Sequence, residues 1–224
     1  MLGERSTGTN LVKRLMLRNS GLTPTEALGW KHGHPHALAI PPDLAVVCML
    51  RNAADWALSM HAKPWHTTPQ MQALEFSDFI RAPWTTIIDR PRYFEGAEQQ
   101  GLIGQPLQLD RSPLTGDPYA NLFALRRAKQ AGLLSYLNRA CTCVILRAET
   151  IQAAQQPTMD RLRAALGQPP RTAAFRPVGK RLGSKFKAAI ATRPNTPGSL
   201  SDTDRAFMIS QLDKTAEATL GYSY

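Results

Sequence analysis

The segment Gly3-Glu-Arg-Ser-Thr-Gly-Thr-Asn10 decides how the rest of the chain is interpreted, because two glycines bracket a polar turn that leads directly into a helical pattern. Its spacing, Gly-x4-Gly, is that of the P-loop, where backbone N–H groups and a helix N-terminus bind phosphate. Thr9 stands where the nucleoside triphosphate motif requires the lysine that reaches the terminal phosphates. The segment therefore predicts a site for a phosphorylated ligand other than ATP or GTP, or else a Ser, Thr and Gly turn that only caps a helix.

Composition restricts the class of protein. The chain has 224 residues, of which 43% are apolar, and this suits a single domain over residues 1–224 with a sizeable core. Lys and Arg outnumber Asp and Glu by 27 to 17, and the net charge of +10 favours an anionic ligand or partner. These cations are dispersed and lack interleaved aromatic residues, so nucleic acid is the less favoured partner. No apolar run reaches the roughly 18 residues of a membrane span and no signal-peptide pattern opens the chain, so a cytoplasmic protein is expected.

The apolar pattern predicts an α/β fold. Continuous apolar runs over 45–50 and 142–146 indicate strands buried in a mainly parallel sheet. Helical spacing predicts helices on both faces of this sheet, giving three layers. These helices are expected over 11–17, 53–61, 121–137, 158–167 and 201–221. The last two start at caps on Thr158 and Ser201. Only Met1 and Leu2 precede Gly3, so the first strand is expected to be short or truncated. The irregular segment 67–118 is predicted to form a substrate or lid region.

With both strand-to-helix loops placed, the sequence resembles the sulfotransferases, which transfer the sulfuryl group of 3'-phosphoadenosine-5'-phosphosulfate (PAPS) to an alcohol, phenol or amine. The segment 4–10 is similar to the family's 5'-phosphosulfate loop in its bacterial form, Glu-Arg-x-x-Gly-Thr-Asn. Arg51 at the end of a strand, with Ser59 eight residues later on a helix, is similar to the 3'-phosphate motif. Trp30-Lys31-His32-Gly33 is similar to the Lys/His segment near the acceptor. Fainter likeness continues through 126–129, 144–149 and 220–222.

The resemblance implies a P-loop-like sulfotransferase fold, PAPS as donor and a hydroxyl-bearing or amine acceptor such as a glycan, a lipid or a small metabolite. The two ends of PAPS would be held at two anion sites, and sulfate carries less charge than phosphate, so we expect no metal ion. A late basic loop within 171–187 is expected either to close over the nucleotide or to be simply solvated. The residues expected to bind PAPS are Arg5, Ser6, Thr7, Gly8, Thr9, Asn10, Arg51, Ser59, Lys180 and Arg181.

The expected catalytic residues are Arg5, Lys31 and His32. Arg5 would stabilise charge on the departing phosphate, and Lys31 is the alternative cation because Ser6 stands where animal cytosolic enzymes have lysine. His32 is the leading candidate for the base that accepts the acceptor's proton, with His34 and Glu149 as alternatives.

Arg126 and Lys129, one helical turn apart, could contact the cofactor or an acidic acceptor. Cys48, Cys141 and Cys143 lack a metal-binding spacing and are expected to be reduced thiols.

Two other functions compete with this interpretation. One is a non-catalytic basic module that uses the loop to bind nucleic acid or another polyanion. The other is a nucleotide kinase, which Thr9 and the lack of a magnesium-binding aspartate at the strand ends disfavour. The sequence specifies neither the acceptor nor the oligomeric state.

Overall fold

A computed structural model describes residues 1–179 and 185–224 of the chain. The chain forms two compact units: unit 1 comprises Met1–Asn52 and Gln130–Lys185, and unit 2 comprises Ala53–Lys129 and Phe186–Tyr224. Lys180 and Arg181, the predicted late-loop cations, lie outside the described residues.

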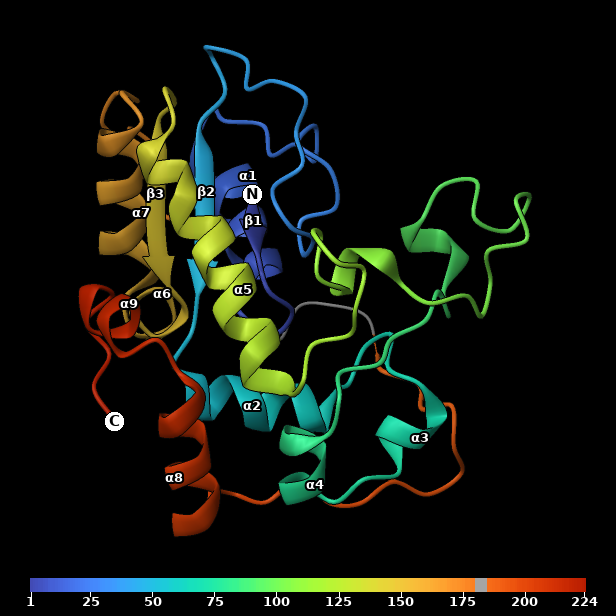
Figure 1. Cartoon of the computed structure of the whole chain (residues 1–224). Coiled ribbons are helices and arrows are strands. Elements are labelled where there is room, and N and C mark those ends of the chain that lie inside the picture. Colours follow the sequence, from blue (N-terminus) through green and yellow to red (C-terminus); the bar gives the residue numbers. More distant parts are fainter. Residues whose placement is uncertain (180–184) are drawn as a thin grey trace. The chain divides into compact units, whose positions relative to one another are not determined.

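Unit 1 is built on a parallel sheet of three strands in the order β1-β2-β3 (Figure 1). The central strand β2 (Val46–Leu50) pairs with β3 (Cys143–Arg147) along its whole length, with Cys48 opposite Ile145. The strand β1 (Leu2–Gly3) is only two residues long and pairs with Cys48 and Met49 of β2. The apolar runs form strands because every residue of β2 is buried, as parallel sheets covered on both faces require.

Helices cover this sheet on both faces. On one face, α1 (Thr9–Asn19), α6 (Ala148–Ala153) and α7 (Gln155–Ala165) form a core with Val47 and Met49 of β2. On the other face, the thiol of Cys48 donates a hydrogen bond to the carbonyl of Leu133 at 3.8 Å. Leu133 belongs to α5 (Leu122–Leu134), which begins in unit 2 and ends in unit 1 and is followed by the 3-10 helix η3 (Ser135–Asn138). The expected α/β architecture, a parallel sheet flanked by helices, is confirmed.

Unit 2 contains no strand among the residues described and consists of helices and long connections. Its elements are α2 (Ala53–Ala62), α3 (Pro69–Gln72), α4 (Phe76–Arg81), η1 (Pro91–Tyr93), η2 (Gln108–Asp110), the first part of α5, α8 (Asp202–Gln211) and α9 (Lys214–Thr219). Figure 1 shows α2, α4 and α8 grouped together, and their apolar side chains form one core around Trp56, Phe79 and Trp84. Burying side chains of this size contributes about 1.5–3 kcal/mol each.

Two details of the predicted helices are wrong. The helix expected over 201–221 is broken at Leu212, because Asp213 caps a new helix, α9, by accepting a hydrogen bond from the N–H of Ala216 at 3.0 Å. Thr158 does not cap its helix: α7 begins at Gln155, and the hydroxyl of Thr158 instead donates to the carbonyl of Thr150 at 3.4 Å.

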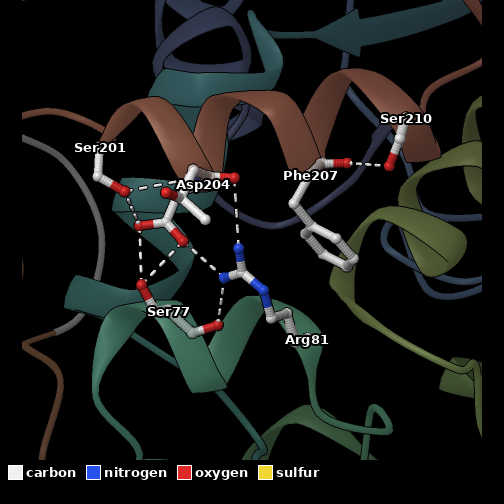
Figure 2. A network of polar contacts seen from close by, with 7 residues as sticks. Ser77, Arg81, Ser201, Asp204, Phe207 and Ser210 are labelled. Carbon is white, nitrogen blue, oxygen red and sulfur yellow. Dashed lines mark hydrogen bonds and ion pairs between the residues drawn. The ribbon is translucent and has the colours of Figure 1, made fainter.

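A buried carboxylate fastens the start of α8 to α4 (Figure 2). Asp204 accepts hydrogen bonds from the hydroxyls of Ser77 and Ser201 at 2.8 Å each and from Arg81 Nη1 at 2.5 Å. The hydroxyl of Ser201 also accepts from the N–H of Asp204 at 3.1 Å and caps the helix. The guanidinium of Arg81 lies 4.5 Å from the ring centre of Phe207. Burial opposes ionisation of Asp204, but the bonds from Arg81, Ser201 and Ser77 and the charge of Arg81 outweigh it and lower its pKa.

We expect Asp204→Asn to reduce the free energy of unfolding by about 2 kcal/mol, because the amide leaves the guanidinium and the hydroxyls with a poorer acceptor. Because the pKa of Asp204 is lower in the folded state than the unfolded value of 3.8, its carboxylate stabilises the protein above that pH. This stabilisation is lost as the pH falls through the folded-state pKa, so the difference in stability between the native protein and Asp204→Asn should shrink in strong acid. Urea unfolding at neutral and acid pH measures both effects. Asp202→Asn, in the same helical turn but exposed, is the control, and an equal loss there would contradict the role given to Asp204.

Candidate functional site

The loop between β1 and α1 is held close to the central strand by its two glycines. A Cβ on Gly3, whose φ is +155°, would lie 2.8 Å from both Cβ and the carbonyl oxygen of Met49 and 2.9 Å from the hydroxyl of Thr7. Gly8 precedes α1 with φ 90° and ψ 14°, a left-handed conformation that glycine adopts at little cost. Any other residue at position 3 would push the loop away from β2.

Several backbone donors of this loop have no acceptor. Within the part of the chain that the structure describes, the N–H groups of Ser6, Gly8, Thr9 and Asn10 contact no hydrogen-bond acceptor. The carbonyl of Gly8 accepts from the N–H groups of Leu11 and Val12 at 2.9 and 3.2 Å, so α1 is closed from there onward. The arrangement suits a phosphate or sulfate group at the positive end of an 11-residue helix.

The side chains of Glu4, Arg5 and Thr7 shape the loop from inside. The carboxylate of Glu4 accepts from the N–H of Arg5 at 2.6 Å and forms an ion pair with Nε of Arg5 at 3.0 Å, and both residues are buried. The hydroxyl of Thr7 donates to the carbonyl of Glu4 at 2.6 Å and closes the turn. Arg5 thus lies at the predicted position inside the loop, but as one member of an ion pair.

The predicted Lys/His segment packs onto the outer edge of β1. The N–H of Gly3 donates to the carbonyl of Lys31 at 2.9 Å, so the backbone of Lys31 contacts the edge of β1 that faces away from β2. The ammonium of Lys31 donates to Oδ1 of Asn10 at 3.1 Å and lies 3.8 Å from Glu26, which also pairs with Lys13 at 3.1 Å. A cation is therefore placed at the N-terminus of α1.

His32 binds the carbonyl of the same residue, Gly3. Its Nδ1 lies 2.5 Å from the carbonyl oxygen of Gly3, and because a carbonyl only accepts, Nδ1 carries the proton and Nε2 is the basic nitrogen. Desolvation lowers the pKa of His32 to about 3, against smaller opposing effects of Glu4 and of the bond to Gly3. The imidazole is neutral at physiological pH.

Arg51 joins the loop from the carboxyl end of β2. Its Nη1 donates to the carbonyl of Ser6 at 3.1 Å, which brings the second predicted anion site into contact with the first. Glu149, the alternative base, accepts a hydrogen bond from the N–H of Asn52 at 2.8 Å and so fixes the residue after Arg51. Parallel register places Arg147 opposite Leu50, at the same end of the sheet.

Other predicted residues lie elsewhere. Ser59 lies on α2 in unit 2, so it does not share a unit with Arg51. His34 accepts at its carbonyl from Nδ1 of His36 at 2.5 Å in the segment after Lys31. Cys48 is buried and Cys141 and Cys143 are partly buried, and all three are free thiols.

Arg126 and Lys129, which could have contacted a ligand, form buried ion pairs instead. Both side chains are buried in unit 2, where Arg126 forms a two-bond ion pair with Glu217 at 2.8 and 2.9 Å and Lys129 pairs with Asp110. Each cation is thus paired with a carboxylate that is distant in the sequence.

One contributor to the site was not anticipated from the sequence. Trp30 is partly buried, with its ring centre 5.8 Å from the guanidinium carbon of Arg5 and edge-on to His32 at 5.3 Å. The sequence signal for its place in the site was its position immediately before Lys31 and His32. The ring helps desolvate both catalytic candidates.

Charge is distributed unequally between the two units. Unit 1 contains fifteen of the 27 Lys and Arg and five of the 17 Asp and Glu, a net charge of +10. Unit 2 contains the remaining twelve of each and is neutral. The entire net charge is therefore carried by the unit that contains the loop between β1 and α1.

No family model, curated protein or solved structure matches the chain. Among the described residues, no group of three or more His, Cys, Asp or Glu side chains could hold a metal ion. No helix in the described part of the chain is long and apolar enough to cross a membrane.

We expect His32→Asn to flatten the dependence of stability on pH between about 6.5 and about 3. Asparagine keeps a donor for the carbonyl of Gly3 but does not titrate. In the native protein the folded state binds fewer protons than the unfolded state in this window, so stability is present above pH 6.5 and falls as pH decreases toward 3. Urea unfolding at pH 7.5 and 4.5 measures the slope, and identical slopes in the two proteins would contradict the assignment.

Proposed function

We propose that the chain is a sulfotransferase that transfers the sulfuryl group of PAPS to a hydroxyl or amine acceptor. The observation that supports this most is the convergence of three sequence segments within unit 1. Arg51 and Lys31 hydrogen-bond to the loop at Ser6 and Asn10, and His32 hydrogen-bonds to Gly3 where the loop begins. Two cations and a neutral base thus surround backbone donors that lack acceptors.

The phosphosulfate end fits the loop and α1. The N–H groups of Ser6, Gly8, Thr9 and Asn10 supply donors, and Lys31 supplies a positive charge at the helix N-terminus. Donors fixed before the ligand arrives stabilise charge that develops on the departing phosphate without reorganisation. Arg5, held in place by Glu4, adds a second cation beside the loop.

The 3'-phosphate end is assigned to Arg51. A planar guanidinium binds phosphate through two parallel hydrogen bonds, and its contact with Ser6 fixes its orientation.

His32 fits the role of the base that accepts the acceptor's proton. The bond from Nδ1 to Gly3 fixes the tautomer and leaves Nε2 to accept a proton. A pKa of about 3 keeps the ring unprotonated, and the anionic donor bound beside it would raise this value toward one useful for proton transfer. Glu149 is the weaker candidate because its carboxylate already accepts from Asn52.

The proposal predicts that the desulfated product 3',5'-ADP stabilises the protein without magnesium. At a ligand concentration of about 100 times Kd the gain is about 2.7 kcal/mol, or a rise in Tm of about 5–10 °C for a chain of this length. Arg51→Ala should weaken 3',5'-ADP at least about tenfold more than 5'-AMP, since only 3',5'-ADP carries the 3'-phosphate.

Arg139→Ala is the matched control, because it removes an exposed arginine from the same unit. Stabilisation by ADP with magnesium but not by 3',5'-ADP would refute the proposal in favour of a kinase. Equal losses of 3',5'-ADP and 5'-AMP in Arg51→Ala would remove Arg51 from the 3'-phosphate site.

We further predict that His32→Asn lowers the rate of transfer from sulfur-labelled PAPS by about 100-fold or more and leaves 3',5'-ADP affinity within about twofold. The asparagine preserves the bond to Gly3, so the loop keeps its shape. A screen of hydroxyl-bearing acceptors supplies the assay. Full activity in this variant would transfer the role of base to His34 or Glu149.

A further inference from the structure

Exposed arginines lie along α1 and on the segment that is hydrogen-bonded to the C-terminal end of α1. Arg14 and Arg18 are exposed and one helical turn apart, so they share a face of α1. Arg18 lies about 12 Å along the helix from Asn10, at 1.5 Å per residue. Arg18 is therefore separate from the loop assigned to PAPS, and Arg14 lies one helical turn, about 6 Å, beyond Asn10.

The segment that carries Arg176 is fastened beside them by paired hydrogen bonds. The buried amide of Asn19 donates to the carbonyl of Arg176 at 3.1 Å and accepts from its N–H at 2.8 Å. Arg18 donates to the carbonyl of Pro177 at 2.6 Å, and Gln155 of α7 bonds both backbone groups of Val178 at 2.9 and 3.0 Å. Arg176 is also exposed, and its backbone is bonded to the end of α1, so we call these three exposed residues the arginine face: Arg14, Arg18 and Arg176.

Few acidic groups offset this face. Asp160 on α7 lies 3.5 Å from Arg171, and Glu26 is engaged by Lys13 and Lys31. With five acidic residues, unit 1 keeps a net charge of +10. This positive charge is far more than the binding of one nucleotide needs. A chain that carries a negative charge on each repeating unit would engage several of these arginines at once and release counterions.

Unit 1 offers no platform for base stacking among its described residues. Its aromatic residues are Trp30, Tyr136 and Phe175: Trp30 lies against Arg5 and His32, Tyr136 is buried, and Phe175 is partly buried against the core. Single-stranded nucleic acid binds through open aromatic faces as well as cations. The surface therefore suits a polyanion whose units are not aromatic.

We propose that the arginine face binds an acidic polysaccharide, through its carboxylate or sulfate groups. The surface is an interaction site in addition to the anion loop and does not depend on the proposed transfer reaction.

Fluorescence anisotropy with a labelled heparin oligosaccharide tests this proposal. Arg14→Glu/Arg176→Glu should weaken binding at least about tenfold at fixed ionic strength and reduce the slope of log K against log salt by about 1.5, the loss expected for two contacts. The control is Arg92→Glu/Arg205→Glu, which changes the net charge equally at exposed positions of neutral unit 2 and should stay within about twofold. Urea unfolding verifies that both double variants remain folded.

Equal losses in the two double variants, or no binding by the native chain, would overturn the proposal. Tighter binding of a single-stranded or duplex oligonucleotide than of the oligosaccharide would assign the face to nucleic acid instead. Because 3',5'-ADP binds at the loop, its stabilising effect should persist in Arg14→Glu/Arg176→Glu, so the two proposals fail independently.

Discussion

The close approach of Gly3 to Met49 is the constraint on which the candidate site depends. No side chain fits between them, and this contact fixes where the loop leaves β1 and how near it lies to the carboxyl end of β2. The backbone of Gly3 is then held at the outer edge of β1, its N–H by the carbonyl of Lys31 and its carbonyl by the side chain of His32. A two-residue strand would be a weak foundation alone, but β1 is paired with β2 on one edge and hydrogen-bonded to Lys31 and His32 on the other.

The same contacts bring cations to the loop although Thr9 stands where the P-loop has its lysine. The P-loop lysine belongs to the helix itself, whereas here the cation arrives from outside, with Lys31 bonded to Asn10. Arg51 approaches from β2 and bonds Ser6. A cation supplied by a neighbouring segment fits a ligand with less charge than a triphosphate, consistent with the absence of the helix lysine.

Patterns confined to one element were readable from the sequence. Continuous apolar runs identified β2 and β3, and helical spacing identified α1, α2 and α5, because burial alone decides these elements. The three segments of the candidate site each have their own local spacing, and the structure brings them into contact in unit 1. Contacts between distant segments were not readable: Arg126 was a candidate for ligand contact, yet Glu217, 91 residues away, pairs with it. The neutral state of His32 depends likewise on desolvation that no spacing reveals.

The positions of the carboxylates decide which cations remain available to bind ligands. In unit 2, Glu217, Asp110, Asp204 and Asp89 engage Arg126, Lys129, Arg81 and Arg90, and the unit is neutral. In unit 1, Glu4 and Glu26 engage Arg5, Lys13 and Lys31 at the loop, and Glu149 binds a backbone N–H. Three of the five acidic residues of unit 1, Glu4, Glu26 and Glu149, thus lie at the candidate site, and Arg14 and Arg18 of α1 stay exposed. A net charge of +10 concentrated in this way would attract anions to one half of the molecule, which a uniform distribution would not do.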